Sequence, residues 1–262
     1  MWRMIFAKKS LGQNFLKDKN ILKKITDLTE IKNRNIIEIG PGEGSLTEQI
    51  LNKKPKSLVI IEKDDHLAAN LKKKYLKNKI IRVYNDDILK VNVEKVIKKN
   101  SLIMGNLPYN ISSQILVKFL KFRIWLPNFT DLVFMFQKEL GEKIISKFPS
   151  SNYGRISILT NYRLKIKNKF YVSPNSFFPK PKVTSMVIHL KPIKNPITIK
   201  DISNLEKVTN ILFSNKRKMI NKNIQKLIKK DKSKKISFLD LKLRPSEIDP
   251  DTYYKITQLY ES

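Results

Sequence analysis

The residues Asn106–Tyr109 (NLPY) have the types and the spacing that most directly indicate chemistry. They follow Ser101–Gly105, a short apolar run typical of a buried strand, so we expect them in a loop at the carboxyl end of that strand. There the Asn side-chain oxygen and the carbonyl before the proline can accept the two hydrogens of an exocyclic amine, which frees the nitrogen lone pair for attack. The proline stiffens the turn and has no N–H of its own, and Tyr109 offers a flat face on which a base can stack. The pattern predicts methylation of an amine such as N6 of adenine.

A glycine-rich segment lies upstream of this motif. Three of the seven glycines, Gly40, Gly42 and Gly44, fall within five residues directly after an expected strand. Glycine is needed where the backbone takes unusual angles or where a ligand approaches without a Cβ in the way. The G-x-G-x-G spacing is one residue shorter than the dinucleotide fingerprint, which suits a nucleoside ligand without a pyrophosphate. An ordinary tight turn is the alternative interpretation of this loop taken by itself.

Acidic residues follow the next two expected strands. Glu62 ends the second strand, 22 positions after Gly40, where a carboxylate can accept hydrogen bonds from both ribose hydroxyls. The third strand runs into Asp86 and Asp87, whose side chain or backbone can bind an adenine amino group. Together the glycine loop and the two acidic positions predict a site for S-adenosylmethionine (SAM).

The elements that must position these residues alternate between strands and helices. Short runs rich in Ile, Val and Leu predict strands at Asn35–Gly40, Ser57–Glu62, Ile80–Tyr84, Ser101–Gly105 and Asp131–Gln137. The segments between them predict helices at Ser45–Lys53, Asp64–Leu76, Ser112–Phe122 and Lys138–Phe148. This alternation predicts an α/β fold with a Rossmann-like, mainly parallel sheet and helices on both faces. Two further runs, Ile156–Lys165 and Thr184–Leu190, predict an antiparallel edge to that sheet.

The character of the chain changes near Pro192–Pro196. Beyond it the pattern predicts only helices, at Ile202–Ser214, Met219–Lys230 and Thr252–Glu261. We therefore expect a domain boundary close to Lys194, which divides residues 1–193 from residues 194–262. Between Asn204 and Lys235 eleven residues are basic and two are acidic, so charge is concentrated on the smaller domain.

Positive charge dominates the composition. Lys and Arg number 53 against 23 Asp and Glu, which gives a formal net charge of +30. A chain this basic repels itself when compact, and a phosphate polyanion would relieve that repulsion. The charge therefore predicts a nucleic-acid partner. The alternative is compositional drift, because only 8 of the 53 basic residues are Arg while Asn and Ile are abundant.

Residue counts exclude other kinds of site. The absence of Cys excludes a disulfide scaffold and Cys-based zinc, iron–sulfur or thiolate chemistry. The two histidines cannot form a three-histidine metal site; we expect His66 at a helix start or surface and His189 in strand packing. No apolar run approaches the ~18 residues of a membrane helix, and the N-terminus has no signal-peptide pattern. We therefore expect a soluble, cytoplasmic protein, and a monomer.

Six motifs spread along the chain are shared with one known family. They are LGQNFL (Leu11–Leu16), EIGPGEGSLT, GNLPYNIS, YGRIS (Tyr153–Ser157), FFPKPKV (Phe177–Val183) and FSNKRKMINKNI (Phe213–Ile224). With them the chain resembles, over essentially its whole length, the small-subunit rRNA adenine N6-dimethyltransferases. The Leu of N-L-P-Y and the Q-N-F-L segment are specific to this group, because DNA adenine methylases more often have D-P-P-Y or N-P-P-Y.

The resemblance implies a class I SAM-dependent methyltransferase sheet in residues 1–193 and a small basic helical rRNA-binding domain in residues 194–262. Residues 1–34 would contribute to cofactor and RNA binding. Cofactor contacts are implied at Asn14, Leu16, Gly40, Glu62, Asp87 and Asn106, and the glycine loop adds Gly42. The catalytic set is Asn106, Leu107, Pro108, Tyr109 and Phe177, with the target adenine between Tyr109 and Phe177, to which Phe178 is adjacent. Candidate RNA-binding residues are Lys216, Arg217, Lys218 and Lys222.

The activity that the resemblance implies is transfer of four methyl groups from SAM, without a metal, to two adjacent adenosines in the 3′-terminal hairpin loop of small-subunit (16S) rRNA. The expected partners are this rRNA and the immature small subunit, late in its assembly. A non-catalytic assembly factor is one alternative, although the intact glycine loop, Glu62, Asp87 and N-L-P-Y argue against lost chemistry. Another alternative is a large-subunit rRNA methyltransferase of the macrolide-resistance type. The basic run Lys216–Lys218 favours the small-subunit group over this alternative. A mitochondrial transcription factor and a nicotinamide dehydrogenase fit less well, because the chain shows no targeting pattern before Leu11 and its glycine spacing is wrong for a dinucleotide.

Overall fold

The computed structural model describes residues 13–228 and 236–262. Its described residues form two compact units. Of these residues, unit 1 takes in 13–118, Pro127–Gly141 and Ile166–Pro192, and unit 2 takes in Phe119–Leu126, Glu142–Lys165, 193–228 and 236–262. This division differs from a single boundary near Lys194, because two earlier segments belong with the C-terminal residues. The functional roles expected for the two regions stay predictions.

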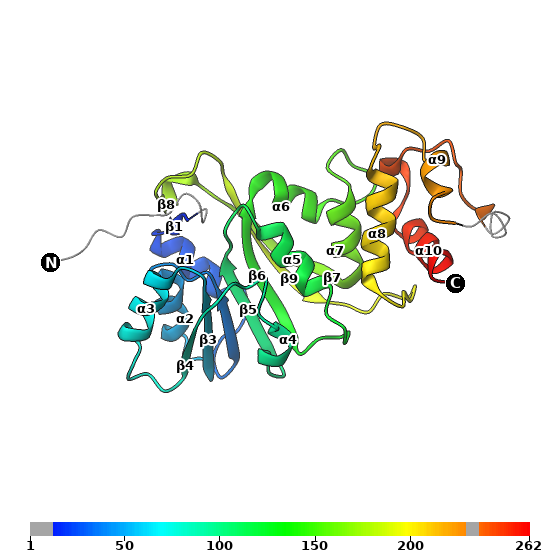
Figure 1. Ribbon diagram of the computed structural model, residues 1–262. Helices are drawn as coiled ribbons and strands as arrows, with labels where there is room; N and C mark the ends of the chain where they lie inside the picture. Colours follow the sequence, from blue (N-terminus) through cyan, green and yellow to red (C-terminus); the bar gives the residue numbers. More distant parts are fainter. Residues whose placement is uncertain (1–12, 229–235) are drawn as a thin grey trace. The chain divides into compact units, whose positions relative to one another are not determined.

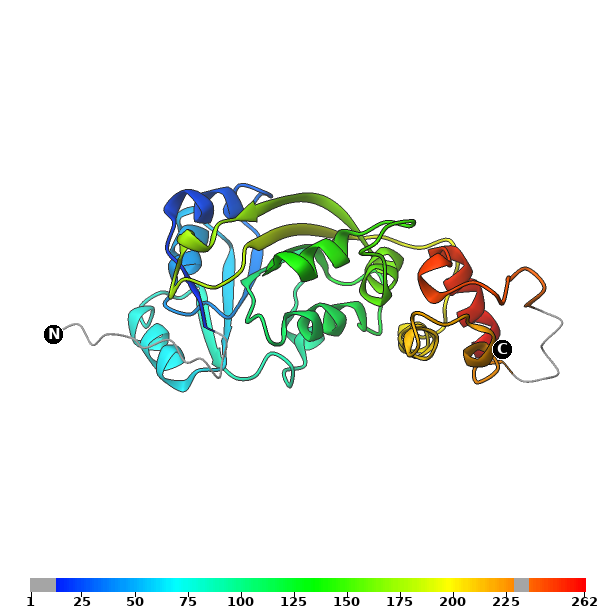
Figure 2. The same cartoon turned by 90° about the horizontal axis from the view of Figure 1, so that it is seen from above.

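The centre of unit 1 is a seven-stranded mixed sheet in the order β4-β3-β2-β5-β6-β9-β7 (Figure 1). Its strands are β2 (Asn35–Ile39), β3 (Ser57–Glu62), β4 (Ile81–Asn85), β5 (Ser101–Asn106), β6 (Phe129–Gln137), β7 (Leu164–Val172) and β9 (Ser185–Pro192). From β4 to β6 in this order each pair of adjacent strands is parallel, and β9 pairs antiparallel with β6. Figure 2 shows the two long strands β7 and β9 side by side. The predicted α/β fold is confirmed.

The order of the strands creates a switch point beside β2. The chain runs from β2 to β3 and β4 on one side, then returns to place β5 on the other side of β2. In open α/β sheets, ligands bind outside the carboxyl ends of the strands at this point. The connecting helices are α2 (Ser45–Asn52), α3 (Asp65–Lys74), α4 (Val93–Val96), α5 (Ser112–Leu120) and α6 (Lys138–Ile145). The fold thus places the glycine loop and the NLPY loop at the same edge of the sheet.

The N-terminal segment contributes elements that are not among the helices and strands expected from the sequence, although Leu22 and Ile25 lie on one buried face of a helix capped by Asp18. Helix α1 (Lys19–Thr26) begins after Asp18, whose side chain accepts hydrogen bonds from two backbone N–H groups of its first turn. The two-residue strand β1 (Phe15–Leu16) pairs antiparallel with β8 (Phe177–Phe178). Strands this short have no alternation to recognise, so a pattern of period two cannot find them.

The prediction of a strand at Ile156–Lys165 is wrong for most of its length. Arg155–Arg163 form helix α7, and strand β7 begins only at Leu164. The Gly154 N–H donates to the Ser157 hydroxyl at 3.1 Å, which caps the first turn of the helix. Six of the nine residues of α7 are buried, so the helix lacks the polar face by which amphipathic helices are recognised.

Unit 2 is helical around buried aromatic side chains. Helix α7 packs against α8 (Ile202–Phe213) and α10 (Pro250–Glu261). The rings of Phe213 and Tyr253 stack at 5.9 Å between centroids. Within the described part of the predicted helix Met219–Lys230, only α9 (Asn221–Ile224) is α-helical, and Lys229 and Lys230 lie outside the described residues. A short 3₁₀ turn occurs in unit 2 at Pro245–Glu247, and another occurs in unit 1 at Pro174–Ser176.

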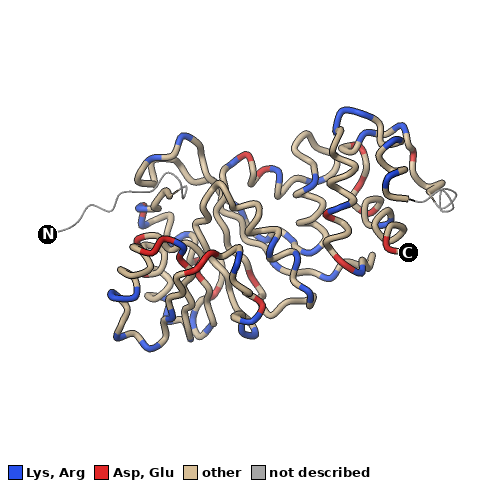
Figure 3. Tube along the Cα trace, in the orientation of Figure 1, with Lys and Arg blue, Asp and Glu red and all other residues tan. Residues whose placement is uncertain are grey.

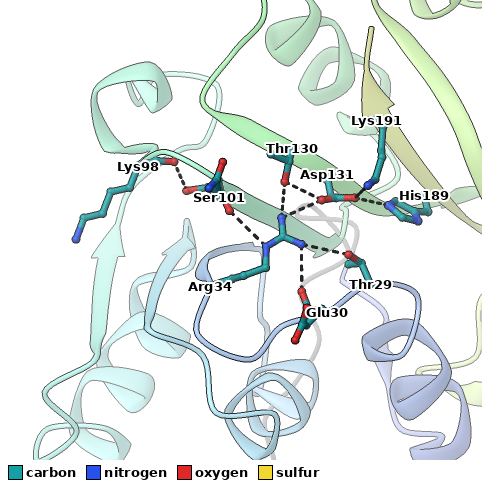
Figure 4. A network of polar contacts seen from close by, with 10 residues as sticks. Thr29, Glu30, Arg34, Lys98, Ser101, Thr130, Asp131, His189 and Lys191 are labelled. Atoms are coloured by element: carbon teal, nitrogen blue, oxygen red, sulfur yellow. Dashed lines mark hydrogen bonds and ion pairs between the residues drawn. The ribbon is translucent and has the colours of Figure 1, made fainter.

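Figure 4 shows a cluster of polar contacts around Arg34 and Asp131. Arg34 precedes β2 and the glycine loop follows it, so the cluster lies at the opposite end of that strand from the loop. Arg34, which precedes β2, donates from Nη2 to Asp131 Oδ2 at 2.9 Å. The other carboxylate oxygen of Asp131 lies 2.7 Å from His189 Nε2. His189, expected in strand packing, is indeed buried, but it also has this buried carboxylate partner.

Candidate functional site

A cavity of about 1090 Å³, including its open mouth, lies in unit 1 at the carboxyl ends of β2, β3 and β5. It is lined by every residue expected to contact the cofactor and by all of the NLPY motif: Asn14, Leu16, Gly40, Gly42, Glu62, Asp87, Asn106, Leu107, Pro108 and Tyr109. These residues come from five separate stretches of the chain. The fold therefore brings together ten of the predicted site residues in one cavity.

The glycine loop has a backbone that side chains rarely adopt. Gly40, Gly42 and Gly44 have φ angles of +64°, +60° and +88°. A Cβ on Gly42 would also lie 2.7 Å from Cδ1 of Phe15, so the ring of Phe15 packs directly on the loop. Positive φ and close packing both require glycine here. The ring and the loop together form one wall of the cavity.

Glu62 is buried and already holds two backbone groups. Its Oε2 accepts from the Gly42 N–H at 3.2 Å, and its Oε1 accepts from the Asp64 N–H at 2.8 Å. Burial raises the pKa of Glu62, and the backbone N–H groups of Asp64, Gly42 and Lys63 oppose that rise. Since a carboxylate oxygen has two lone pairs, each oxygen can still accept one more hydrogen bond, which is what a ribose diol offers.

Asp87, after β4, has an ion-pair partner that the sequence did not indicate. Its Oδ2 lies 2.9 Å from Lys63 Nζ, and its Oδ1 accepts from the Leu89 N–H at 2.9 Å. Partial burial raises the pKa of Asp87, but these contacts outweigh it and lower the pKa below its usual value. The carboxylate is therefore ionised and held in place for a donor such as an adenine amino group.

Asn106 is oriented by the N-terminal segment. Its Nδ2 donates to the Asn14 carbonyl at 2.8 Å. This bond uses the donor side of the amide and leaves the acceptor role to Oδ1. The backbone before Asn106 is also closely fitted, because a Cβ on Gly105 would lie 2.6 Å from the Ile39 carbonyl oxygen of β2. Asn106 is thus an amide with a fixed direction at the edge of the cavity.

Tyr109 is fixed by its hydroxyl. The oxygen lies 2.5 Å from Ser185 Oγ at the start of β9, and burial raises the pKa of the phenol. The ring therefore stays neutral and keeps one orientation beside Asn106. Such a surface suits stacking of a base.

Phe177 does not join Tyr109 in the cavity. Its side chain is 5% exposed and belongs to the core cluster that includes Leu16, Leu22 and Ile25. The neighbouring Phe178 is 64% exposed. The expected position of Phe177 over the target base is therefore not the one in this structure, and of these two rings that of Phe178 is the exposed one.

A second cavity, of about 1190 Å³, lies in unit 2. Lys216 and Arg217 of the predicted RNA-binding set line it, while Lys218 and Lys222 are exposed nearby in the chain. Three further basic side chains that the sequence did not indicate also line it: Lys143, Arg155 and Arg244. Among the described residues that line this cavity none is acidic. Arg155 belongs to the YGRIS motif, which was the available signal, but nothing in the sequence joined it to Arg244.

Two other properties concern the described residues only. In residues 13–228 and 236–262 no cluster of three or more His, Asp or Glu side chains could hold a metal ion. The same residues contain no helix that is long and apolar enough to cross a membrane.

The sheet order, the glycine loop after β2 and the acidic side chains after β3 and β4 define a class I SAM-dependent methyltransferase fold. A family model described as "Ribosomal RNA adenine dimethylase" matches residues 5–262. Since this match covers nearly the whole sequence, the chain belongs to the ribosomal RNA adenine dimethylase family.

Curated relatives agree with this assignment. The chain is 46% identical over 262 residues to ribosomal RNA small subunit methyltransferase A of Pelagibacter ubique (strain HTCC1062), with 97% of each chain covered. It is 41% identical to the protein of the same name from Wolbachia sp. subsp. Drosophila simulans (strain wRi), over 86% of this chain and 82% of the relative.

Solved structures extend the comparison to the fold. A dimethyladenosine transferase from Plasmodium falciparum superimposes with a TM-score of 0.73 at 27% identity, over 92% of this chain and 95% of that one. The 23S rRNA methyltransferase ErmE superimposes with a TM-score of 0.64 at 19% identity, over 95% and 100%, and shows the fold alone.

Proposed function

We propose that this chain transfers methyl groups from SAM to N6 of adenosines in small-subunit rRNA. The observation that carries the proposal is the position of Asn106: its amide nitrogen is engaged by Asn14 and its oxygen is left as an acceptor, beside Tyr109 and in the same cavity as Glu62 and Asp87. Family membership and the names of the relatives support rRNA as the substrate.

The residues of the cavity fit the cofactor. Gly40 and Gly42 let the ligand approach the backbone, Glu62 retains lone pairs for the ribose hydroxyls, and Asp87 is an ionised acceptor for the adenine amino group. Asn14 and Leu16 close the cavity from the N-terminal side. When bound, SAM supplies an electrophilic methyl group on a sulfonium.

The protein's part in the reaction is to orient and polarise the target amine. Asn106 Oδ1 and the Leu107 carbonyl accept the two N6 hydrogens, which localises the nitrogen lone pair for in-line attack. Tyr109 fixes the plane of the base. These hydrogen bonds strengthen as the nitrogen becomes tetrahedral, so they favour the transition state over the ground state. No strong base is required, because the proton can leave to water after the attack.

RNA binding is assigned to both units. An unpaired adenosine costs less to turn into the cavity than a paired one, which favours a hairpin loop as the target. The five basic side chains of the unit 2 cavity provide contacts for phosphates. We further infer that the products are two adjacent dimethyladenosines in the 3′-terminal hairpin. We also infer that the enzyme is a monomer, that its substrate is the small subunit late in assembly, and that it works in the cytoplasm.

Variants of Asn106 test the assignment of the chemistry. Removing one preorganised hydrogen-bonding group typically costs roughly 100- to 1000-fold in rate. We expect Asn106→Ala to lose at least this much in single-turnover methyl transfer to unmethylated small-subunit rRNA, while RNA affinity stays within about twofold. Asn106→Asp keeps an acceptor oxygen but loses the donor to Asn14, so we expect a rate between those of Asn106→Ala and the wild type. Full activity of Asn106→Ala would remove Asn106 from the mechanism.

A further inference from the structure

Strand β7 is an outer strand of the seven-stranded sheet and carries an exposed row of side chains. Within unit 1 the alternate residues Lys167, Lys169 and Tyr171 are exposed, and Tyr171 reaches 55% exposure. On the other face of the strand Ile166 and Phe170 are partly buried, whereas Asn168 is exposed. Successive side chains of a strand point to opposite faces, so the two lysines and the tyrosine lie on one face.

This row connects to the candidate site through a short series of contacts. Lys138 places its Nζ 5.5 Å from the centroid of the Tyr171 ring. The backbone N–H of Lys138 donates to the Thr184 carbonyl at 2.9 Å. The next residue, Ser185, shares its hydrogen bond with Tyr109. We call the face made by Lys138, Lys167, Lys169 and Tyr171 the β7 face. Through these contacts it is connected to Tyr109 of the NLPY motif.

The charge of this region has one sign. Residues 166–192 contain five Lys and no Asp or Glu (Figure 3). Lysines on an outer strand also prevent pairing with other sheets, but that role needs no exposed aromatic ring. A cationic surface combined with exposed aromatic side chains is the arrangement that binds single-stranded nucleic acid. The β7 face has both features.

We propose that the β7 face binds the RNA strand that flanks the target adenosine, with Lys167 and Lys169 on successive phosphates and Tyr171 stacked on an unpaired base. Side chains two positions apart on a strand are separated by roughly 6.7 Å, which is close to the separation of neighbouring phosphates on an extended RNA strand. The proposal rests on the proposed function, since it uses the position of Tyr109 as the place where the target base enters.

Salt dependence of RNA binding tests the two lysines. For single strands the slope of log K against log salt changes by about 0.7 for each phosphate contact. We therefore expect Lys167→Ala/Lys169→Ala to flatten that slope by about 1.4, measured with an unmethylated transcript of small-subunit rRNA. The matched control is Lys77→Ala/Lys79→Ala, with the same charge change at two exposed residues that precede β4, the opposite outer strand. We expect the control to keep the wild-type slope.

Two variants of Tyr171 test stacking. Tyr171→Phe keeps the ring and should keep the affinity, whereas Tyr171→Ala should weaken binding roughly tenfold, because stacking on an aromatic side chain contributes that much per base. Affinity for S-adenosylhomocysteine, measured by calorimetry, should be unchanged in all these variants and serves as the check of the fold.

Three outcomes decide the proposal. A slope that flattens only in Lys167→Ala/Lys169→Ala supports it. An unchanged slope in Lys167→Ala/Lys169→Ala overturns the proposal. If that variant also self-associates, the two lysines serve only to prevent the outer strand from pairing with other sheets. If the wild type methylates no rRNA, the proposed function fails, while the slopes still report separately whether the β7 face binds RNA.

Discussion

Phe177 and Phe178 are neighbours in the chain with opposite surroundings. The resemblance assigns contact with the target base to Phe177, but its side chain is in the core, while that of Phe178 is in solvent. We expect Phe177→Ala to lower the free energy of unfolding by about 3–5 kcal/mol, the usual loss for a buried Phe. Phe178→Ala should change it by less than about 0.5 kcal/mol and should instead raise the KM for rRNA.

Chemical denaturation and steady-state kinetics of the two variants measure these effects separately. A third variant, Phe177→Leu, keeps an apolar side chain in the core. If it has normal stability but has lost methyl transfer, the structural role assigned to Phe177 is contradicted. Such a result would mean that Phe177 leaves the core to cover the base, as the resemblance implies.

Glu38 in β2 is a buried acid that the proposed chemistry does not use. Burial raises its pKa from 4.5 to about 8, against the hydrogen bond that Thr47 donates to it, and the nearby Glu62 adds to the rise. Between these values the folded state holds a proton that the unfolded state has released. The contribution of Glu38 to the free energy of unfolding therefore falls as the pH rises from about 4.5 to about 8.

Glu38→Gln removes this titration and keeps an acceptor for Thr47. We expect the variant to gain stability relative to the wild type as the pH is raised from 5 to 8, by a few kcal/mol. Urea denaturation of both proteins at the two pH values gives the difference directly, because other titrating groups cancel. A difference that does not change with pH would contradict the assignment of a proton to Glu38.

The Asp131 cluster (Figure 4) links β6 to β9 and to Arg34, which directly precedes β2. Burial raises the pKa of Asp131, but the hydrogen bonds from His189, Thr130 and Arg34 outweigh it and hold the pKa well below its usual value. The stability that Asp131 contributes is thus present above about pH 4 and is lost as the carboxylate is protonated in acid.

Asp131→Ala leaves Arg34 and His189 without their common partner. We expect it to lower the free energy of unfolding by about 3–5 kcal/mol and to leave affinity for S-adenosylhomocysteine unchanged. Asp131→Asn should lose less, since it retains an acceptor, and should lack part of the wild-type loss of stability in acid. Equal stability of Asp131→Ala and wild type at pH 7 would show that the cluster contributes nothing.

The elements also show what the sequence can predict. Strands β2, β3 and β5 were predicted within a residue or two, because strands buried on both faces are continuous apolar runs. Helix α7 was predicted as a strand because burial on most sides removed its polar face. The glycine loop, Glu62, Asp87 and NLPY could be placed at one edge because parallel strands end together. The Lys63–Asp87 pair and the packing of Phe177 depend on side-chain positions that no local pattern specifies.

The net charge of +30 predicts a polyanionic partner but does not indicate where that partner binds. The sequence identified Lys216 and Arg217 as a basic run. Folding adds Arg155 and Arg244, which come from distant parts of the chain, to the same cavity of unit 2. Unit 1 contains the candidate catalytic cavity by itself. Each unit therefore offers one feature that a methyltransferase acting on RNA requires.

The most direct test is to measure the transfer of labelled methyl groups from SAM into three substrates: unmethylated small subunits, large subunits and free rRNA. The modified nucleoside is then identified by nuclease digestion and mass spectrometry. We expect N6,N6-dimethyladenosine in small-subunit RNA and no label in large subunits. Label in large-subunit RNA would make the chain an enzyme of the macrolide-resistance type. Tight binding to small subunits without any transfer would contradict the account and leave a non-catalytic assembly factor.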